Sequence, residues 1–164
     1  MEASVLDSLQ ACLDGGANLF LTGQNFVEQN QSAPLFASTL GVAWAGNTGL
    51  SFNQGVSGDI LNGFNCFTTG SSANNQTSRD SLRALRSGIV RILDYGSNTG
   101  RAAAFRIDSV GPAGAKAVVM GFGFEAIHTT EKRDALLLAI LNYFRGITSV
   151  EPTSDGTIPS GFVL

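Results

Sequence analysis

The chain has 164 residues, the usual size of one domain. Its 43% hydrophobic and 14% charged residues fit a folded globule and exclude an extended, disordered chain. Its net charge of −3 leaves little positive charge for nucleic acid or an anionic membrane surface, so we expect neither as a partner.

The first elements follow the pattern of an α/β protein. Helically spaced apolar residues predict a helix over residues 2–13, which Gly15 and Gly16 end. Cys12 shares the apolar stripe of this helix with Val5 and Leu9, so we expect it to be buried. The apolar run 18–22 follows as a short strand. A strand that would precede the helix in an alternating pattern is missing.

The middle of the chain is read as a short helix, an insertion and a longer helix. Pro34 opens a helix over 34–40, and residues 42–76 form an irregular β insertion in which Cys66 packs inward. Ser78 or Thr77 then caps a helix over 79–94. Its arginines fall away from its apolar side and are expected to form a solvated face, with an anion site as the alternative; they are Arg79, Arg83, Arg86 and Arg91.

The last part of the chain predicts two strands and a helix. Residues 101–108 alternate as a half-exposed strand, and residues 116–124 are apolar on both faces, as in a central parallel strand. A helix over 130–145 follows, capped by Thr129 or Thr130, with four residues inward: Leu137, Ile140, Leu141 and Phe144. Residues 148–164 contain two prolines and read as a linker or tail, so the α/β domain spans 1–147.

Helices that alternate with apolar strands predict a three-layer α/β/α sandwich with a mostly parallel sheet. Ligands of such folds bind beyond the carboxyl ends of the strands. Two loops satisfy this condition, and their candidate binding residues are Thr22, Gly23, Gln24 and Asn25 in the first and Gly123 and Glu125 in the second.

The candidate catalytic groups at these ends are Glu125, His128 and Thr22. His128, the only histidine, could act as a base oriented by Glu125, and the alternative is an exposed residue ahead of a helix cap. Glu125 could instead hydrogen-bond the donors of a neighbouring loop, a structural role. We expect no cofactor, because no phosphate-binding loop is present. Metal binding has no strong candidate, although oxygens of the 55–80 loops could bind Ca²⁺: Asp59, Asn74, Asn75 and Asp80.

Four segments of the sequence together resemble a known type of module: residues 13–25, 55–64, 71–82 and 117–144. The module occurs in large secreted or surface proteins of bacteria and is similar to the class I glutamine amidotransferase-like, flavodoxin-like fold. The resemblance covers nearly the whole chain. The tail resembles a linker to a C-terminal sorting or Ig-like module.

The resemblance implies that amidotransferase chemistry is lost. At the position of the family's cysteine nucleophile this chain has Thr22, followed by Gly23 and Gln24. Glu125 matches the family's glutamate, but a glycine or phenylalanine replaces its histidine. The leading hypothesis is therefore a non-catalytic α/β scaffold or binding module of a larger exported protein. The alternative is a hydrolase with a residual site at Glu125, His128 and Thr22.

The resemblance and the sequence ends also predict where the protein is located and which partners it has. The N-terminal residues MEASVLDS lack the features of a signal peptide, yet the resemblance implies a secreted or surface parent protein. Other domains of that parent are the expected partners. A sheet that lacks one strand exposes backbone donors and acceptors at its edge, so we also expect a homodimer through this edge.

Overall fold

The computed structural model describes residues 3–70 and 72–147, and this part of the chain forms one curled, mixed sheet with few helices. Most strands lie in the order β1-β8-β7-β6-β3-β4, while β2 pairs with β5 and β5 pairs with β7. Only the β1–β8 pair is parallel; the other pairs are antiparallel. The strands are β1 (Leu19–Thr22), β2 (Val42–Thr48), β3 (Phe52–Gly55), β4 (Asn65–Phe67), β5 (Arg79–Ala84), β6 (Ile89–Tyr95), β7 (Ala102–Val110) and β8 (Ala115–Met120).

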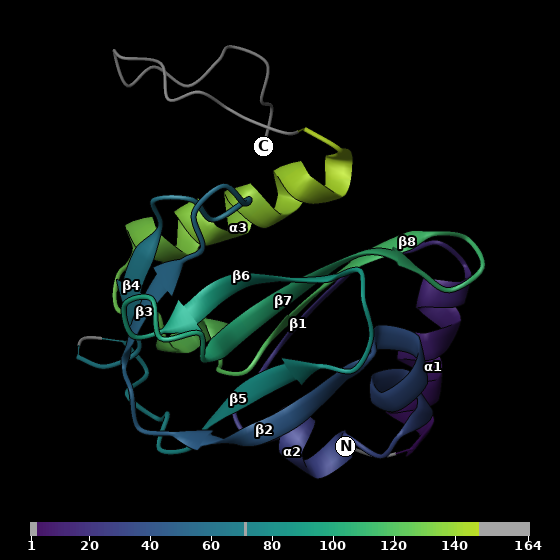
Figure 1. Ribbon diagram of the computed structural model, residues 1–164, viewed down its shortest axis with the longest axis horizontal. Coiled ribbons are helices and arrows are strands. Elements are labelled where there is room, and N and C mark those ends of the chain that lie inside the picture. The colour runs from purple at the N-terminus through teal and green to yellow at the C-terminus, as the bar shows by residue number, and fades with distance from the viewer. Residues whose placement is uncertain (1–2, 71, 148–164) are drawn as a thin grey trace.

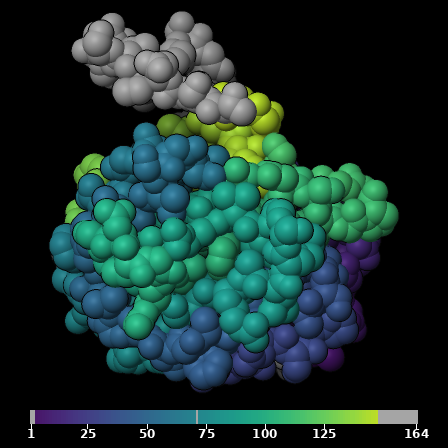
Figure 2. Space-filling model, in the orientation of Figure 1, coloured from purple at the N-terminus to yellow at the C-terminus, as the bar shows by residue number. Residues whose placement is uncertain are grey.

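The helices cover the two faces of this sheet. They are α1 (Ala3–Asp14), α2 (Phe26–Asn30), a π-helical turn η1 (Leu35–Leu40), a 3-10 turn η2 (Phe124–Ala126) and α3 (Thr130–Arg145). Figure 1 shows α3 above the sheet, with α1 and α2 on the side of the β2–β5 arm. In Figure 2 teal surface from the middle of the chain fills the centre of the front, and the purple of α1 shows at the right margin. No described helix is long and apolar enough to cross a membrane.

Two hydrophobic clusters lie on opposite sides of the sheet. The first holds Leu13 of α1, Val27 of α2 and Phe36 of η1 against strand residues such as Val119. The second holds Leu136 and Ile140 of α3 against the other side of the strands, including Ile92, Val118 and Met120. β8 is apolar on both faces because each of its faces packs against one of the two clusters.

The predicted three-layer α/β/α sandwich with a mostly parallel sheet is wrong. The molecule is a curled half-barrel of mixed, mostly antiparallel strands. The error begins at residues 79–94, where β5 and β6 replace the predicted helix. Residues 42–76 are not an insertion either, because β2 pairs with β5 and β3 pairs with β6 inside the same sheet.

Several local predictions are confirmed. Helix α3 begins at the predicted cap, where Thr129 Oγ1 accepts a hydrogen bond from the backbone N–H of Lys132, and ends at Gly146 with φ 75°. The strand predictions at 18–22, 101–108 and 116–124 are confirmed in position by β1, β7 and β8. Their details are partly wrong: β7 is buried on both faces in its first half, and β8 ends at Met120 and pairs parallel with β1 but antiparallel with β7. Cys66 is fully buried, as predicted.

Other local predictions are wrong about which helix residues are buried. Cys12 and Val5 are exposed, because the inward stripe of α1 runs through Leu6, Leu9 and Leu13 instead. In α3, Leu137 and Leu141 are each 38% exposed, while Leu136 and Tyr143 are buried together with Ile140. The linker predicted over 148–164 lies outside the described residues.

Candidate functional site

The carboxyl ends of β1 and β8 lie side by side, since Thr22 is in register with Met120. The residues that follow each strand pack against the segment 72–78, which leads into β5. The place where these three loops meet is called the junction below. Thr22 contributes directly to this junction, because its Oγ1 accepts a hydrogen bond from the Phe124 backbone N–H at 3.1 Å. The two predicted loops are therefore joined to each other and to a third segment that the sequence did not indicate.

Two glutamines hold the segment 72–78 in place. Gln24 Oε1 accepts the backbone N–H groups of Thr77 at 3.0 Å and Ser78 at 3.3 Å, and its Nε2 donates to the Asn75 carbonyl at 2.9 Å. Gln76 is buried and accepts the Gly123 N–H at 3.0 Å through Oε1. Gln24 bonds backbone groups of the segment 72–78, and Gln76 bonds the backbone of the loop after β8, so the two amides fix the shape of the junction.

Glu125 lies at the outer rim of the same junction and is exposed. Its Oε1 accepts hydrogen bonds from Gln76 Nε2 at 3.3 Å and Asn75 Nδ2 at 3.4 Å. The carboxylate folds back over Gly123, where a Cβ atom would lie 2.2 Å from Glu125 Oε1. Glycine at 123 therefore makes room for this carboxylate. The neighbouring loop that the Glu125 carboxylate contacts is 72–78, through the side-chain amides of Asn75 and Gln76.

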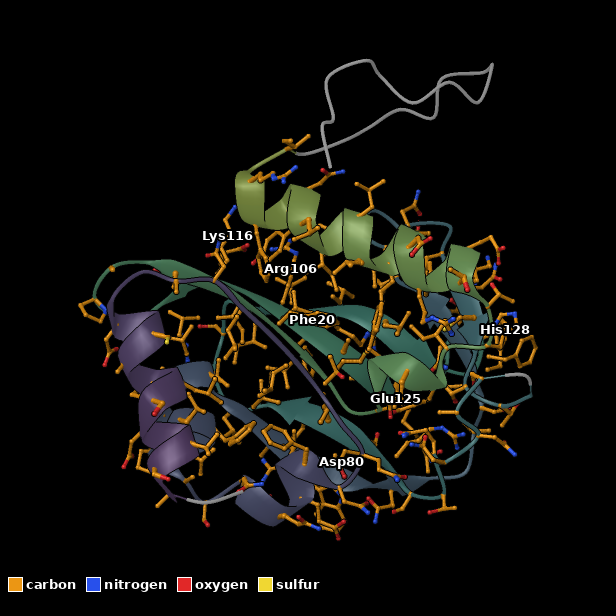
Figure 3. All side chains as sticks on the ribbon, turned by 180° about the vertical axis from the view of Figure 1, so that it is seen from behind. Phe20, Asp80, Arg106, Lys116, Glu125 and His128 are labelled. Carbon is orange, nitrogen blue, oxygen red and sulfur yellow. The ribbon has the colours of Figure 1, made fainter. Side chains whose placement is uncertain are left out.

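His128 contacts β4 and takes no part in the hydrogen bonds of the junction described above. Its Nδ1 accepts the Phe67 N–H at 3.1 Å, and its own backbone N–H donates to the Phe67 carbonyl at 2.9 Å. Its ring meets the Phe67 ring edge-on, with centroids 5.7 Å apart. Figure 3 shows His128 at the β4 side of the molecule, beyond the η2 turn that carries Glu125. An Nδ1 that accepts an amide carries no proton, so the neutral ring is protonated at Nε2.

A buried carboxylate that sequence reasoning assigned only to a possible Ca²⁺ set completes the junction. Asp80 of β5 is fully buried, and its Oδ2 accepts the N–H groups of Val27 at 2.7 Å and Glu28 at 3.2 Å, at the start of α2. Burial raises the pKa of Asp80 above its usual range, although the bonds from Glu28 and Val27 oppose this. No local pattern could reveal this role, because its partners lie about fifty residues earlier.

The backbone of Asp80 also closes the curl of the sheet. Its N–H donates to the Gly121 carbonyl at 2.8 Å, and its carbonyl accepts the Tyr95 hydroxyl at 3.1 Å. A Cβ atom at Gly121 would lie 1.9 Å from the Asp80 carbonyl oxygen. Only glycine permits this approach between β5 and the end of β8.

The four arginines of residues 79–94 do not converge on one site. Arg79 is buried, burial lowers the pKa of its guanidinium, and its Nη2 donates to the Thr68 carbonyl at 2.9 Å. Arg83 and Arg86 donate to backbone carbonyls of Trp44 and Thr39. The solvated helix face is therefore wrong, because these residues lie on strands and turns with separate partners.

The oxygens proposed for Ca²⁺ are also separated. Asp59 pairs with Arg106 at 2.8 Å, Asp80 binds the start of α2, and Asn75 donates to Glu125. Among residues 3–70 and 72–147 no group of three acidic, histidine or cysteine side chains could hold a metal ion. Cys66 lies apart from these loops, and burial raises the pKa of its thiol to about 12.

The comparisons with known proteins identify fold neighbours only. No family model and no curated protein matches the chain. The mmIFT52 N-terminal domain is similar with a TM-score of 0.58 and 13% identity, over 88% of this chain and 72% of that one. The exo-beta-1,4-mannosidase Op5Man5 from Opitutaceae bacterium strain TAV5 has a TM-score of 0.55 and 12% identity, over 92% of this chain.

This chain spans only 24% of the mannosidase chain. The likeness to mmIFT52, together with the curled and mostly antiparallel sheet, overturns the expected membership of the amidotransferase-like, flavodoxin-like modules. The fold is that of a curled, mixed β-rich domain.

Proposed function

We propose that this domain is a non-catalytic scaffold or binding module of a larger exported protein. One observation carries the proposal: the polar side chains at the carboxyl ends of β1 and β8 brace the segment 72–78. Six hydrogen bonds that involve the side chain of Gln24, Gln76 or Glu125 join this segment to the loops after β1 and β8. Such bonds hold a loop in one conformation, which favours a surface that presents groups to a partner.

Each candidate catalytic group has a structural contact. The Thr22 hydroxyl accepts the Phe124 N–H, the Glu125 carboxylate accepts two side-chain amides, and His128 Nδ1 accepts the Phe67 N–H. A nucleophile and its base must lie within hydrogen-bond reach of one another and share a reacting centre. The contacts of Thr22 and His128 lead to different elements, which favours the structural role over the alternative of a hydrolase.

The braced segment presents groups suited to a polar ligand. Ala73, Asn74, Asn75 and Thr77 are exposed, and Asn74 has a positive φ of 48°. Amide and hydroxyl groups both donate and accept hydrogen bonds, which suits a glycan or a polar protein surface. In the mannosidase the matched fold makes up 24% of the chain, so this fold does occur inside a longer polypeptide.

The proposal is tested by binding and by turnover on the same preparation. Binding is measured on an array of soluble oligosaccharides and polysaccharides, with wild type, the Asn74→Gly/Thr77→Ala variant and Ser97→Ala as a control on another exposed turn. Glycine at 74 keeps the positive φ while removing the amide. We expect a bound glycan to be lost in the double variant and kept in the control.

Turnover is measured on glutamine and on nitrophenyl esters and glycosides. We expect rates at background for wild type and for Glu125→Gln. Hydrolysis that Glu125→Gln or His128→Ala abolishes while the fold is kept, or a covalent adduct on Thr22, would overturn the non-catalytic function.

A further inference from the structure

The outer edge of β1 is open in the described part of the chain. β1 is the last strand of the sheet on its side and pairs only with β8. Its sequence LFLT contains no charge, no proline and no bulge, and all four residues remain partly exposed. Exposed edge strands usually carry charges, prolines or bulges that prevent pairing with another chain. This edge carries none of these.

Helix α3 extends an apolar flank beyond this edge. Leu137 and Leu141 are one turn apart and are each 38% exposed. The flank that contains them continues into Phe144, which packs in the same cluster as Phe20 of β1. The opposite flank faces β4, because Lys132 Nζ donates to Asn65 Oδ1. Leu137 and Leu141 therefore lie on the β1 side of α3, whereas Leu138, which is 48% exposed, lies on its outer side.

Helix α1 also has an exposed apolar flank, on the other face of the sheet. One flank of α1 faces η1, since Thr39 Oγ1 donates to Gln10 Oε1 at 2.6 Å. Val5, which is 44% exposed, and Cys12 lie on the opposite flank, away from η1. Figure 3 looks onto this side of the molecule: β1, marked by Phe20, crosses the front of the sheet with α3 above it and α1 beside it.

We propose that this side of the domain pairs with a second copy of the chain about a two-fold axis perpendicular to the sheet. β1 would pair antiparallel with β1 of the other copy, which continues the sheet. The same axis places α3 against α3 on one face and α1 against α1 on the other, so each apolar flank meets its own image. This inference rests on the fold alone and is independent of the proposed function.

The charges of α3 fit a second copy in this orientation. Asp134 and Arg145, both exposed, lie near the two ends of α3, with Leu137 and Leu141 between them. When two copies of α3 run antiparallel, Asp134 of one lies opposite Arg145 of the other. Opposite charges at the rim of an interface favour this register, while the leucines form its apolar centre.

The oligomeric state of the full chain tests the proposal. Analytical ultracentrifugation over a concentration series should show a dimer for wild type. Leu137→Glu/Leu141→Glu should raise the dimer dissociation constant at least ~30-fold, because it places like charges in the centre of the interface. The matched control is Leu50→Glu/Leu85→Glu, at sites that are 43% and 42% exposed on other elements; it should remain dimeric. A monomeric wild type, or equal loss of the dimer in the control, overturns the proposal.

A charge exchange tests the orientation. Asp134→Arg should weaken the dimer about threefold, and adding Arg145→Asp should restore it. Circular dichroism checks that each variant is folded. Failure of the second change to restore the dimer contradicts the antiparallel arrangement of α3.

Hydrogen exchange identifies any other occupant of the edge. We expect the β1 amides that point away from β8 to become protected as the dimer forms. Protection in a monomer would mean that another part of the same chain, such as residues 148–164, covers β1. That result would also overturn pairing with a second copy.

Discussion

Two carboxylates, Asp80 and Glu125, tie loops together at the same end of the sheet, but one is inside the fold and the other at its rim. Asp80 is fully buried and accepts two backbone amides at the start of α2. Glu125 is exposed and accepts two side-chain amides. Water can replace the partners of Glu125 and not those of Asp80. Burial, rather than the number of hydrogen bonds, therefore decides how much each contributes to stability.

The largest effect is expected from removing the inner carboxylate. Asp80→Ala leaves the buried Val27 N–H and the partly buried Glu28 N–H without their acceptor, and it removes the group that binds the start of α2. We expect the free energy of unfolding to fall by about 2–4 kcal/mol in urea denaturation. Asp80→Asn keeps an acceptor oxygen and should lose about 1.5 kcal/mol or less. Equal losses in both variants would contradict the acceptor role.

A smaller effect is expected at Gln76, which lies between the two carboxylates. Gln76→Ala leaves the buried Gly123 N–H without its acceptor and removes one of the two side-chain amides that donate to the Glu125 carboxylate. We expect a loss of about 1–3 kcal/mol, measured by thermal or urea unfolding. Gln29→Ala, at an exposed position of α2, is the control and should change stability by less than about 0.5 kcal/mol.

These roles could be predicted from the sequence only in part. Helix α3, its Thr129 cap and strands β1 and β8 follow from local patterns, as does the burial of Cys66. The side chain of Thr22 was also placed correctly at a strand end, next to the other predicted loop. These features depend on residues that are close in sequence or on an unbroken apolar run.

The segment 79–94 shows why the rest was not predictable. Leu82, Leu85, Ile89 and Ile92 have helical spacing, which favoured one helix. Gly88, with φ 81°, separates two strands instead, and β5 is held by β2 and β7, both distant in sequence. Strand formation depends on such pairing more than on local preference. The contacts of Asp80 and Gln76 span about fifty residues and leave no local pattern.

The pH dependence of stability reports on the inner carboxylate, Asp80. Burial raises the pKa of Asp80 in the folded state, so the folded protein binds its proton more tightly than the unfolded chain does. Stability from this group is therefore present below the unfolded pKa and is lost as the pH rises through the folded pKa, with a slope of at most about 1.4 kcal/mol per pH unit. Subtracting the curve of Asp80→Asn from that of wild type should reveal this fall. A difference that rises with pH in this window would contradict the raised pKa.

The smallest effect is expected from the outer carboxylate. Glu125→Gln keeps an acceptor oxygen, and its side chain still fits the space that glycine leaves at position 123. The amides of Asn75 and Gln76 can also bond to water at this exposed site. The expected loss of stability is therefore within about 1 kcal/mol, measured by urea unfolding. Hydrogen exchange over residues 72–78 should increase in the same variant, because a rim contact restrains the loop more than it stabilises the fold. A loss as large as that of Asp80→Ala would show that Glu125 is shielded from water in solution and would remove the distinction between the inner and outer groups.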